Sequence, residues 1–128
     1  MTNSPNLFLK AIDFFNDDDF FSAHDLFEEI WVESIGDEKL FFQGLVQVSV
    51  AYFHLVSKNY VGAKSMLIKS ISKLEKFLPE FNGIDTDALV SKMKLTIFEI
   101  DKYFNDNSFI LTYKNIPKLI ISTPLKEN

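Results

Sequence analysis

The residue types that could do chemistry lie on two neighbouring segments of the chain. They are two histidines, a glutamate, two glutamines and a tryptophan: His24, Glu28, Trp31, Gln43, Gln47 and His54. An imidazole and a carboxylate can share a proton or bind a metal ion, and an amide can hold either group in place by hydrogen bonding. The spacing of four between His24 and Glu28 places both side chains on the same side of a helix. We therefore treat the six residues as one candidate site, which two packed helices must bring together.

The segments that carry these residues show helical periodicity. From about residue 19 to residue 34, steps of about 100° per residue place His24 and Glu28 in the middle of an aromatic face. That face also holds Phe20, Phe21 and Trp31. The segment from residue 37 to about residue 57 is apolar nearly all round, which is typical of a helix enclosed by other elements. Because its polar residues Gln43, Gln47 and His54 share one stripe, we expect the two polar faces to meet in the dry interior.

Three interpretations of this cluster stay open. The first is a hydrogen-bond network without catalytic function, because buried polar groups usually satisfy one another. The second is a site for Zn, Mn or Fe with His24, Glu28 and His54 as ligands, although the second helix offers amides where a further carboxylate would bind better. The third is general acid–base chemistry without a metal, carried by Glu28 and one histidine. Trp31 either packs beside the cluster as a core residue or lines a ligand pocket. The core role is favoured, because large aromatic side chains usually belong to the hydrophobic core.

Composition narrows the class of protein. The 128 residues suit one domain, residues 1–128. Cys is absent, which excludes disulfides and thiolate metal sites and agrees with a reducing compartment. The N-terminal residues lack the pattern of a secretory signal, and the longest apolar stretch, residues 40–56, is interrupted by polar groups. We therefore expect a soluble cytoplasmic protein that does not enter a membrane.

Charge argues against one class of partner. The net charge is -5, and every basic residue is lysine. Nucleic-acid binding draws its affinity from clustered cations, and bidentate recognition of phosphate or guanine needs arginine. We therefore expect no nucleic acid as partner.

The remaining segments predict a compact all-α array of about five helices. Asn59 is expected to cap the fourth helix, Pro79 to end it, and Asn82-Gly83 to form a turn. A fifth helix is expected from Asp85 or Thr86 to about Phe104. The tail begins at about residue 105 and runs to residue 128. Within it, Phe109 to Ile121 alternates β-branched and aromatic side chains around Pro117, whose missing N–H argues against a central strand. We expect this tail to lie extended over the helices.

Three blocks of the chain resemble a known family. The blocks are Ala-His-Asp-Leu-Phe-Glu-Glu-Ile-Trp at residues 23–31, Gln-Gly-Leu-Val-Gln-Val-Ser-Val-Ala-Tyr-Phe-His at residues 43–54 and Lys-Asn-Tyr-Val-Gly-Ala at residues 58–63. They are similar to the domain of unknown function 309, a small helical family of bacteria and archaea, over about residues 15–78. The first block of that family reads His-Glu-x-x-Glu-x-x-Trp, which His24, Glu28 and Trp31 match, while Asp25 replaces the first glutamate. The resemblance implies a compact array of about five helices and no established activity.

From these observations we expect a non-catalytic module that binds a small molecule or another protein, without a cofactor. Surplus aromatic surface on the third helix, with Phe41, Phe42, Tyr52 and Phe53 on several sides, leads us to expect self-association as a dimer. The alternative is a metal-dependent hydrolase that uses His24, Glu28 and His54.

Overall fold

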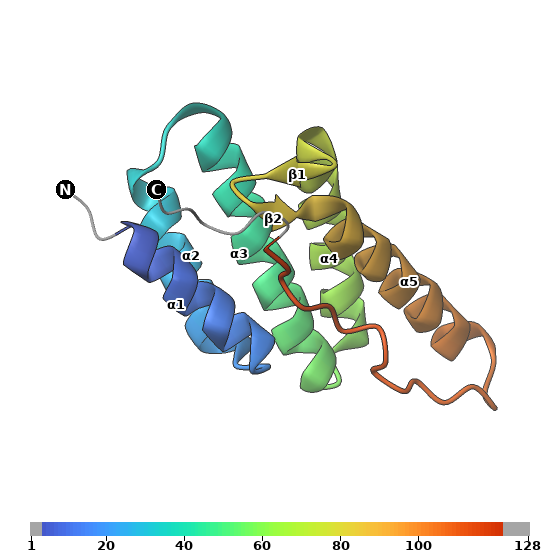
Figure 1. Cartoon of the computed structure of the whole chain (residues 1–128). Helices are drawn as coiled ribbons and strands as arrows, with labels where there is room; N and C mark the ends of the chain where they lie inside the picture. The colour runs from blue at the N-terminus through green and yellow to red at the C-terminus, as the bar shows by residue number, and fades with distance from the viewer. Residues whose placement is uncertain (1–3, 122–128) are drawn as a thin grey trace.

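The computed structural model describes residues 4–121 (Figure 1). Its helices and the two strands of a short hairpin follow one another along the chain: α1 (Ser4–Asn16), α2 (Phe20–Glu33), α3 (Gly36–Val56), α4 (Tyr60–Leu74), the 3-10 helix η1 (Glu75–Phe77), β1 (Glu80–Phe81), β2 (Ile84–Asp85) and α5 (Thr86–Asn105). The all-α prediction with five helices is confirmed. The predicted turn at Asn82-Gly83 joins β1 to β2, and both of its residues have positive φ, 51° and 79°.

Short polar side chains fix where three of the helices begin. The carboxylate of Asp19 accepts a hydrogen bond from the backbone N–H of Ser22, and Asp85 accepts in the same way from Ala88. Asn59 caps α4 as predicted, because its Oδ1 accepts from the N–H of Gly62 at 2.9 Å. The start of α3, by contrast, has no side-chain cap. That helix begins at Gly36, and Asp37 lies in its first turn, where a negative charge suits the helix dipole.

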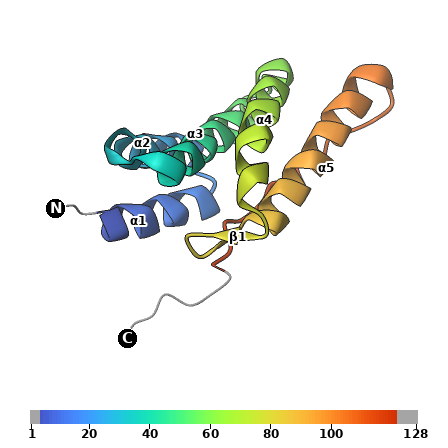
Figure 2. The same cartoon turned by 90° about the horizontal axis from the view of Figure 1, so that it is seen from above.

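The helix α3 forms the centre of the molecule. It packs against α2 on one side and α4 on the other, and α1 packs against α2 (Figure 1 and Figure 2). Its buried side chains lie on about half of its circumference: Phe41, Phe42, Leu45, Val48, Ala51, Tyr52 and Leu55. By length and composition alone α3 is apolar enough to cross a membrane, with a mean hydropathy of 1.2, but half of that window is buried inside the molecule. The central helix of a packed core has the same two properties.

From residue 106 to residue 121 the chain returns across the helices without forming another one (red in Figure 1). Several side-chain contacts hold it in place, and two residue pairs illustrate them. The hydroxyls of Tyr60 and Tyr113 lie 2.6 Å apart, and Asn16 both donates to the carbonyl of Leu119 and accepts from its N–H. Burial, with a further contribution from the Tyr113 hydrogen bond, raises the pKa of Tyr60 to about 12, so this phenol stays protonated at neutral pH. Residues 106–121 thus lie over the helices, whereas residues 122–128 of the predicted tail lie outside the described part, so the extended tail as a whole stays a prediction.

Candidate functional site

The side of α2 that faces the core differs from the one predicted. Its buried residues are Phe20, Ala23, Phe27 and Ile30. On a helix with about 100° per residue this face is centred about 80° away from His24. The side chain of Glu28 therefore lies outside the core and is 50% exposed, while that of His24, at the edge of the core, is 24% exposed. The prediction that all six polar residues meet in the dry interior is wrong for Glu28.

The contacts of His24 define which ring nitrogen carries its proton. Its Nδ1 lies 3.2 Å from the carbonyl oxygen of Phe21 and 3.3 Å from a carboxylate oxygen of Asp25. A carbonyl oxygen can only accept a hydrogen bond, so Nδ1 donates and the proton lies there. The other nitrogen, Nε2, lies 3.7 Å from Glu28 Oε1. In the neutral ring Nε2 therefore holds the free lone pair.

The opposite arrangement holds for His54. The side-chain amide of Asn59 donates to His54 Nδ1 at 3.3 Å. This amide cannot exchange its oxygen and nitrogen without loss, because its Oδ1 already caps α4 through the N–H of Gly62. The lone pair of His54 thus lies on Nδ1 and its proton on Nε2. One local capping contact sets the hydrogen-bonding character of this imidazole.

Both histidines line a single pocket between α2 and α3. The pocket encloses about 220 Å³, and its other walls are apolar: Phe20, Phe21, Val50 and Phe53. The rings of Phe21 and Phe53 lie 6.0 Å apart, and the ring of Phe21 lies 5.5 Å from that of His24. Since the chain has only two histidines, their meeting in one pocket brings together all of its imidazoles. The packing of α2 against α3 therefore places two imidazoles, with the lone pair on Nε2 in one and on Nδ1 in the other, among the lining residues of one aromatic pocket.

The remaining predicted residues do not line this pocket. Trp31 lies at the other end of α2, where the Lys39 ammonium lies 4.7 Å from its ring centroid and donates to its backbone carbonyl. Its ring packs against the hydrophobic core, so it forms part of a wall elsewhere. Gln43 and Gln47 are half-buried on α3, and neither contacts the histidines. Of the six predicted residues, the structure brings together His24 with Glu28 as a contact and His24 with His54 across a pocket.

The amide oxygen of Gln47 is buried without a hydrogen-bond partner among the described residues. Such an unsatisfied acceptor destabilises the folded state, because burial removes its hydrogen bonds to water and no protein donor replaces them. Replacing Gln47 with methionine keeps the shape and removes the unsatisfied acceptor, so we expect the free energy of unfolding to rise by about 1 kcal/mol. Urea denaturation measures this, with Gln43→Met as the matched control and an expected change below about 0.5 kcal/mol. A loss of stability in Gln47→Met would mean that the oxygen has a partner in solution.

The arrangement gives little support to the predicted metal set. In the described part of the chain, one group of side chains has ligand atoms within 4.8 Å of one another, and it consists of His24, Asp25 and Glu28. His54, the third predicted ligand, lies outside this group. Its Nδ1 accepts a hydrogen bond from Asn59, so binding a metal at Nε2 would require the ring to change tautomer and to lose this contact. The two carboxylates are about half exposed, as solvated acids usually are.

Sequence reasoning missed the aromatic walls of the pocket. The helical periodicity places Phe21 on the core face of α2, yet its side chain is more than half exposed and faces Phe53. A signal for Phe53 was present, because it directly precedes His54 on a helix whose apolar residues exceed what one buried face needs. Val50 already fell within the predicted polar stripe of α3. The sequence does not report how α2 and α3 are rotated and shifted relative to each other, and this packing decides which of their residues lie opposite one another.

Comparisons with known proteins agree with the resemblance of the three sequence blocks. Residues 8–66 match the family model described as domain of unknown function (DUF309). The uncharacterized protein YpuF of Bacillus subtilis (strain 168) is 31% identical over 100 residues, which cover 76% of this chain and 58% of YpuF. The chain thus spans little more than half the length of this curated relative. No solved structure matches the chain. From α1 into α4, this chain therefore matches the model of the DUF309 family.

Proposed function

We propose that this protein is a non-catalytic binding module whose pocket between α2 and α3 holds a small, uncharged aromatic molecule with a hydroxyl group. The observation that carries this proposal is the meeting of the chain's two histidines in one otherwise apolar pocket. Ligand sites are typically apolar hollows with a few polar groups that fix orientation. This pocket has that composition.

The two imidazoles suit a hydroxyl because they offer complementary roles. A hydroxyl oxygen can accept from His54 Nε2–H while its hydrogen is donated to the lone pair on His24 Nε2. The carboxylates of Asp25 and Glu28 lie beside His24 and would repel an anion. The volume of about 220 Å³ is below the usual range of about 300–1,000 Å³, which favours a molecule with a single ring.

The lining residues also favour binding over catalysis. No hydroxyl, thiol, amine or carboxylate side chain is among the six residues that line the pocket, so none of them can act as a covalent nucleophile except an imidazole. The phenyl rings of Phe21 and Phe53 offer contact area for a ring of similar size. The pocket thus provides shape and two hydrogen bonds, which are the requirements of recognition.

Titration of the labelled full chain with phenol, followed by amide chemical shifts in NMR, tests this function. We expect shifts at Phe21, Val50 and Phe53, and an affinity about fivefold higher than that of toluene, which lacks the hydroxyl. Filling the pocket with Val50→Phe should abolish binding. The control is Val56→Phe, an exposed position on the same helix that does not line the pocket. Phenol binding that survives Val50→Phe, or equal affinity for toluene, would overturn the proposal.

Two expectations from the sequence stay predictions beside this proposal. Self-association as a dimer has exposed apolar side chains in its favour, among them Val61 on α4 and Phe98 on α5. The cytoplasmic location rests on composition. Neither is needed for ligand binding in the pocket.

A further inference from the structure

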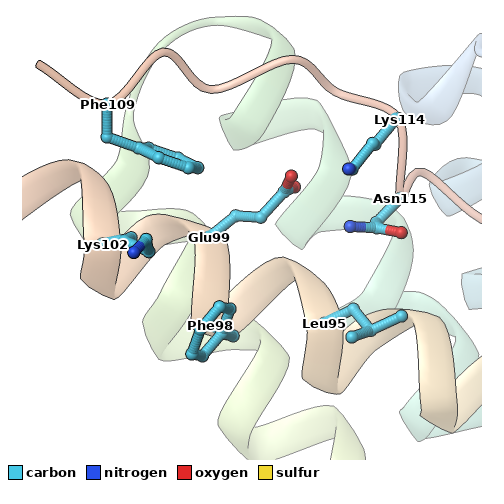
Figure 3. A pocket seen from close by; sticks show the side chains of 7 residues that line it. All are labelled: Leu95, Phe98, Glu99, Lys102, Phe109, Lys114 and Asn115. Carbon is cyan, nitrogen blue, oxygen red and sulfur yellow. The ribbon is translucent and has the colours of Figure 1, made fainter.

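A second cavity lies between α5 and the returning tail, and its most unusual feature is Glu99. The cavity encloses about 310 Å³, and Glu99 lines it although only 6% of this residue is exposed. Figure 3 shows its carboxylate directed from α5 toward the tail, between Phe109 and Lys114. Within residues 4–121 no hydrogen bond or ion pair reaches this carboxylate. An acid that is buried and aimed into a cavity is thus left without a partner.

The nearby hydroxyls of Tyr52 and Thr96 do not supply the missing hydrogen bonds. Thr96 Oγ1 donates toward the carbonyls of Lys92 and Asn115, so the hydroxyl of Tyr52, 2.7 Å away, donates to Thr96. The one proton of this phenol is therefore used, although Tyr52 is near enough to feel the charge of Glu99. A buried carboxylate without partners is costly in its ionised form, and a cationic group that enters the cavity would offset that cost.

The rim of the cavity has the opposite charge. Lys102 and Lys114 both line it, and the Lys102 ammonium lies 5.9 Å from the centroid of the Phe109 ring. Neither lysine forms an ion pair with Glu99 in the structure. One buried negative charge and two exposed positive charges thus share a single hollow. A simple cation would be repelled by the lysines, and a simple anion by Glu99.

We propose that this cavity binds a small zwitterion, a molecule with an ammonium group, a carboxylate group and an apolar body, such as a free amino acid. The ammonium donates to Glu99 at the floor, and the carboxylate meets Lys102 and Lys114 at the rim. The apolar body lies against Leu95, Phe98 and Phe109, which make the walls mainly apolar. The site shares no lining residue with the pocket of the two histidines, so the two proposals stand or fall separately.

NMR titration of the labelled full chain with L-leucine, L-phenylalanine and 6-aminohexanoate tests this site, because these probes cover short and long separations of the two charges. We expect at least one of them to shift the amides of Glu99, Phe109 and Asn115. Two analogues of leucine that keep its side chain but lose one charge, isoamylamine and 4-methylpentanoate, should bind about tenfold more weakly than leucine. If none of the three zwitterions shifts these amides, or if an analogue binds as well as leucine, the proposal is overturned.

Two substitutions separate the roles of floor and rim. Glu99→Gln should lower the affinity for the zwitterion about tenfold without loss of stability, and Glu29→Gln, an exposed position on α2, serves as the control. Lys114→Met changes an exposed side chain and leaves the fold intact. This substitution should lower the affinity for leucine but not the affinity for isoamylamine, because only leucine carries a carboxylate. The assigned roles would be contradicted if Glu99→Gln bound leucine as tightly as the unchanged protein. They would also be contradicted if Lys114→Met lowered the affinities for leucine and isoamylamine equally.

Discussion

Replacing Phe41 with alanine is expected to lower the free energy of unfolding by about 3–5 kcal/mol. Phe41 is fully buried, and its ring contacts three others, with centroids 5.3 Å from Phe42, 5.6 Å from Phe77 and 4.8 Å from Phe81. These rings belong to α3, η1 and β1, so the substitution leaves a cavity where these three elements pack together. A single domain is stabilised by about 5–15 kcal/mol, so this loss removes a large share of the total.

Urea denaturation followed by circular dichroism measures the effect of Phe41→Ala. Phe104→Ala is the matched control, because Phe104 is 54% exposed and loses little contact on truncation. We expect the control to change the free energy of unfolding by less than about 1 kcal/mol. Equal losses in the two variants would show that the cluster around Phe41 does not stabilise the fold as its ring contacts indicate.

The helices were predictable because their beginnings are local. Asp19, Asn59 and Asp85 each accept a hydrogen bond from a backbone N–H three residues later, and that spacing is visible in the sequence. The Asn82-Gly83 turn is an equally local signal, which the hairpin confirms, whereas α4 already ends at Leu74, before Pro79. Signals that need only a few consecutive residues therefore gave the element order and most boundaries.

The rotation of α2 was not predictable in the same way. With Phe20 and Phe21 adjacent, a helical wheel supports two aromatic faces that differ by about 100°. The predicted face held Phe21 and His24 together with Phe20, whereas the buried face holds Phe20 together with Ala23 and Phe27. Only the packing against α3 chooses between them. This single difference placed Glu28 outside the core and kept His24 at its edge.

The cavity of Glu99 was invisible in the sequence for a different reason. It exists because the tail returns across α5, and the contacts that hold the tail join residues far apart in the chain. Asn16 and Leu119 are separated by 103 positions, and Tyr60 and Tyr113 by 53. No periodic pattern reports such a contact. A glutamate on an otherwise amphipathic helix gives no sign that a distant segment will cover it.

Replacing Gly44 with valine is expected to have the second largest effect, a loss of about 3 kcal/mol in the free energy of unfolding. A glycine inside a helix often marks a close approach of another element, and at Gly44 that element is α4. The hydroxyl of Ser70 donates to the Gly44 carbonyl at 2.8 Å, and a Cβ on Gly44 would lie 2.7 Å from Cδ2 of Leu74. Leu74 is fully buried, so its side chain has no free space into which it can move.

Two opposing effects decide the size of this loss. A glycine within a helix costs about 1 kcal/mol relative to alanine, so Gly44→Ala gains helix propensity but is opposed by the overlap with Leu74. Valine adds two methyl groups at the same contact and gains less propensity because it is β-branched. We therefore expect stability to fall in the order glycine, alanine, valine. A more stable Gly44→Ala would mean that the overlap is relieved at little cost.

A double-mutant cycle shows whether the overlap with Leu74 is the cause. Leu74→Ala alone should cost about 2–5 kcal/mol because it leaves a cavity in the core. In the double variant the methyl groups of the introduced valine would partly fill that cavity, so the combined loss should be smaller than the sum of the single losses by at least about 1 kcal/mol. Strictly additive losses in urea denaturation would place the cost of Gly44→Val elsewhere, and the close approach of α3 to α4 would then not depend on this glycine.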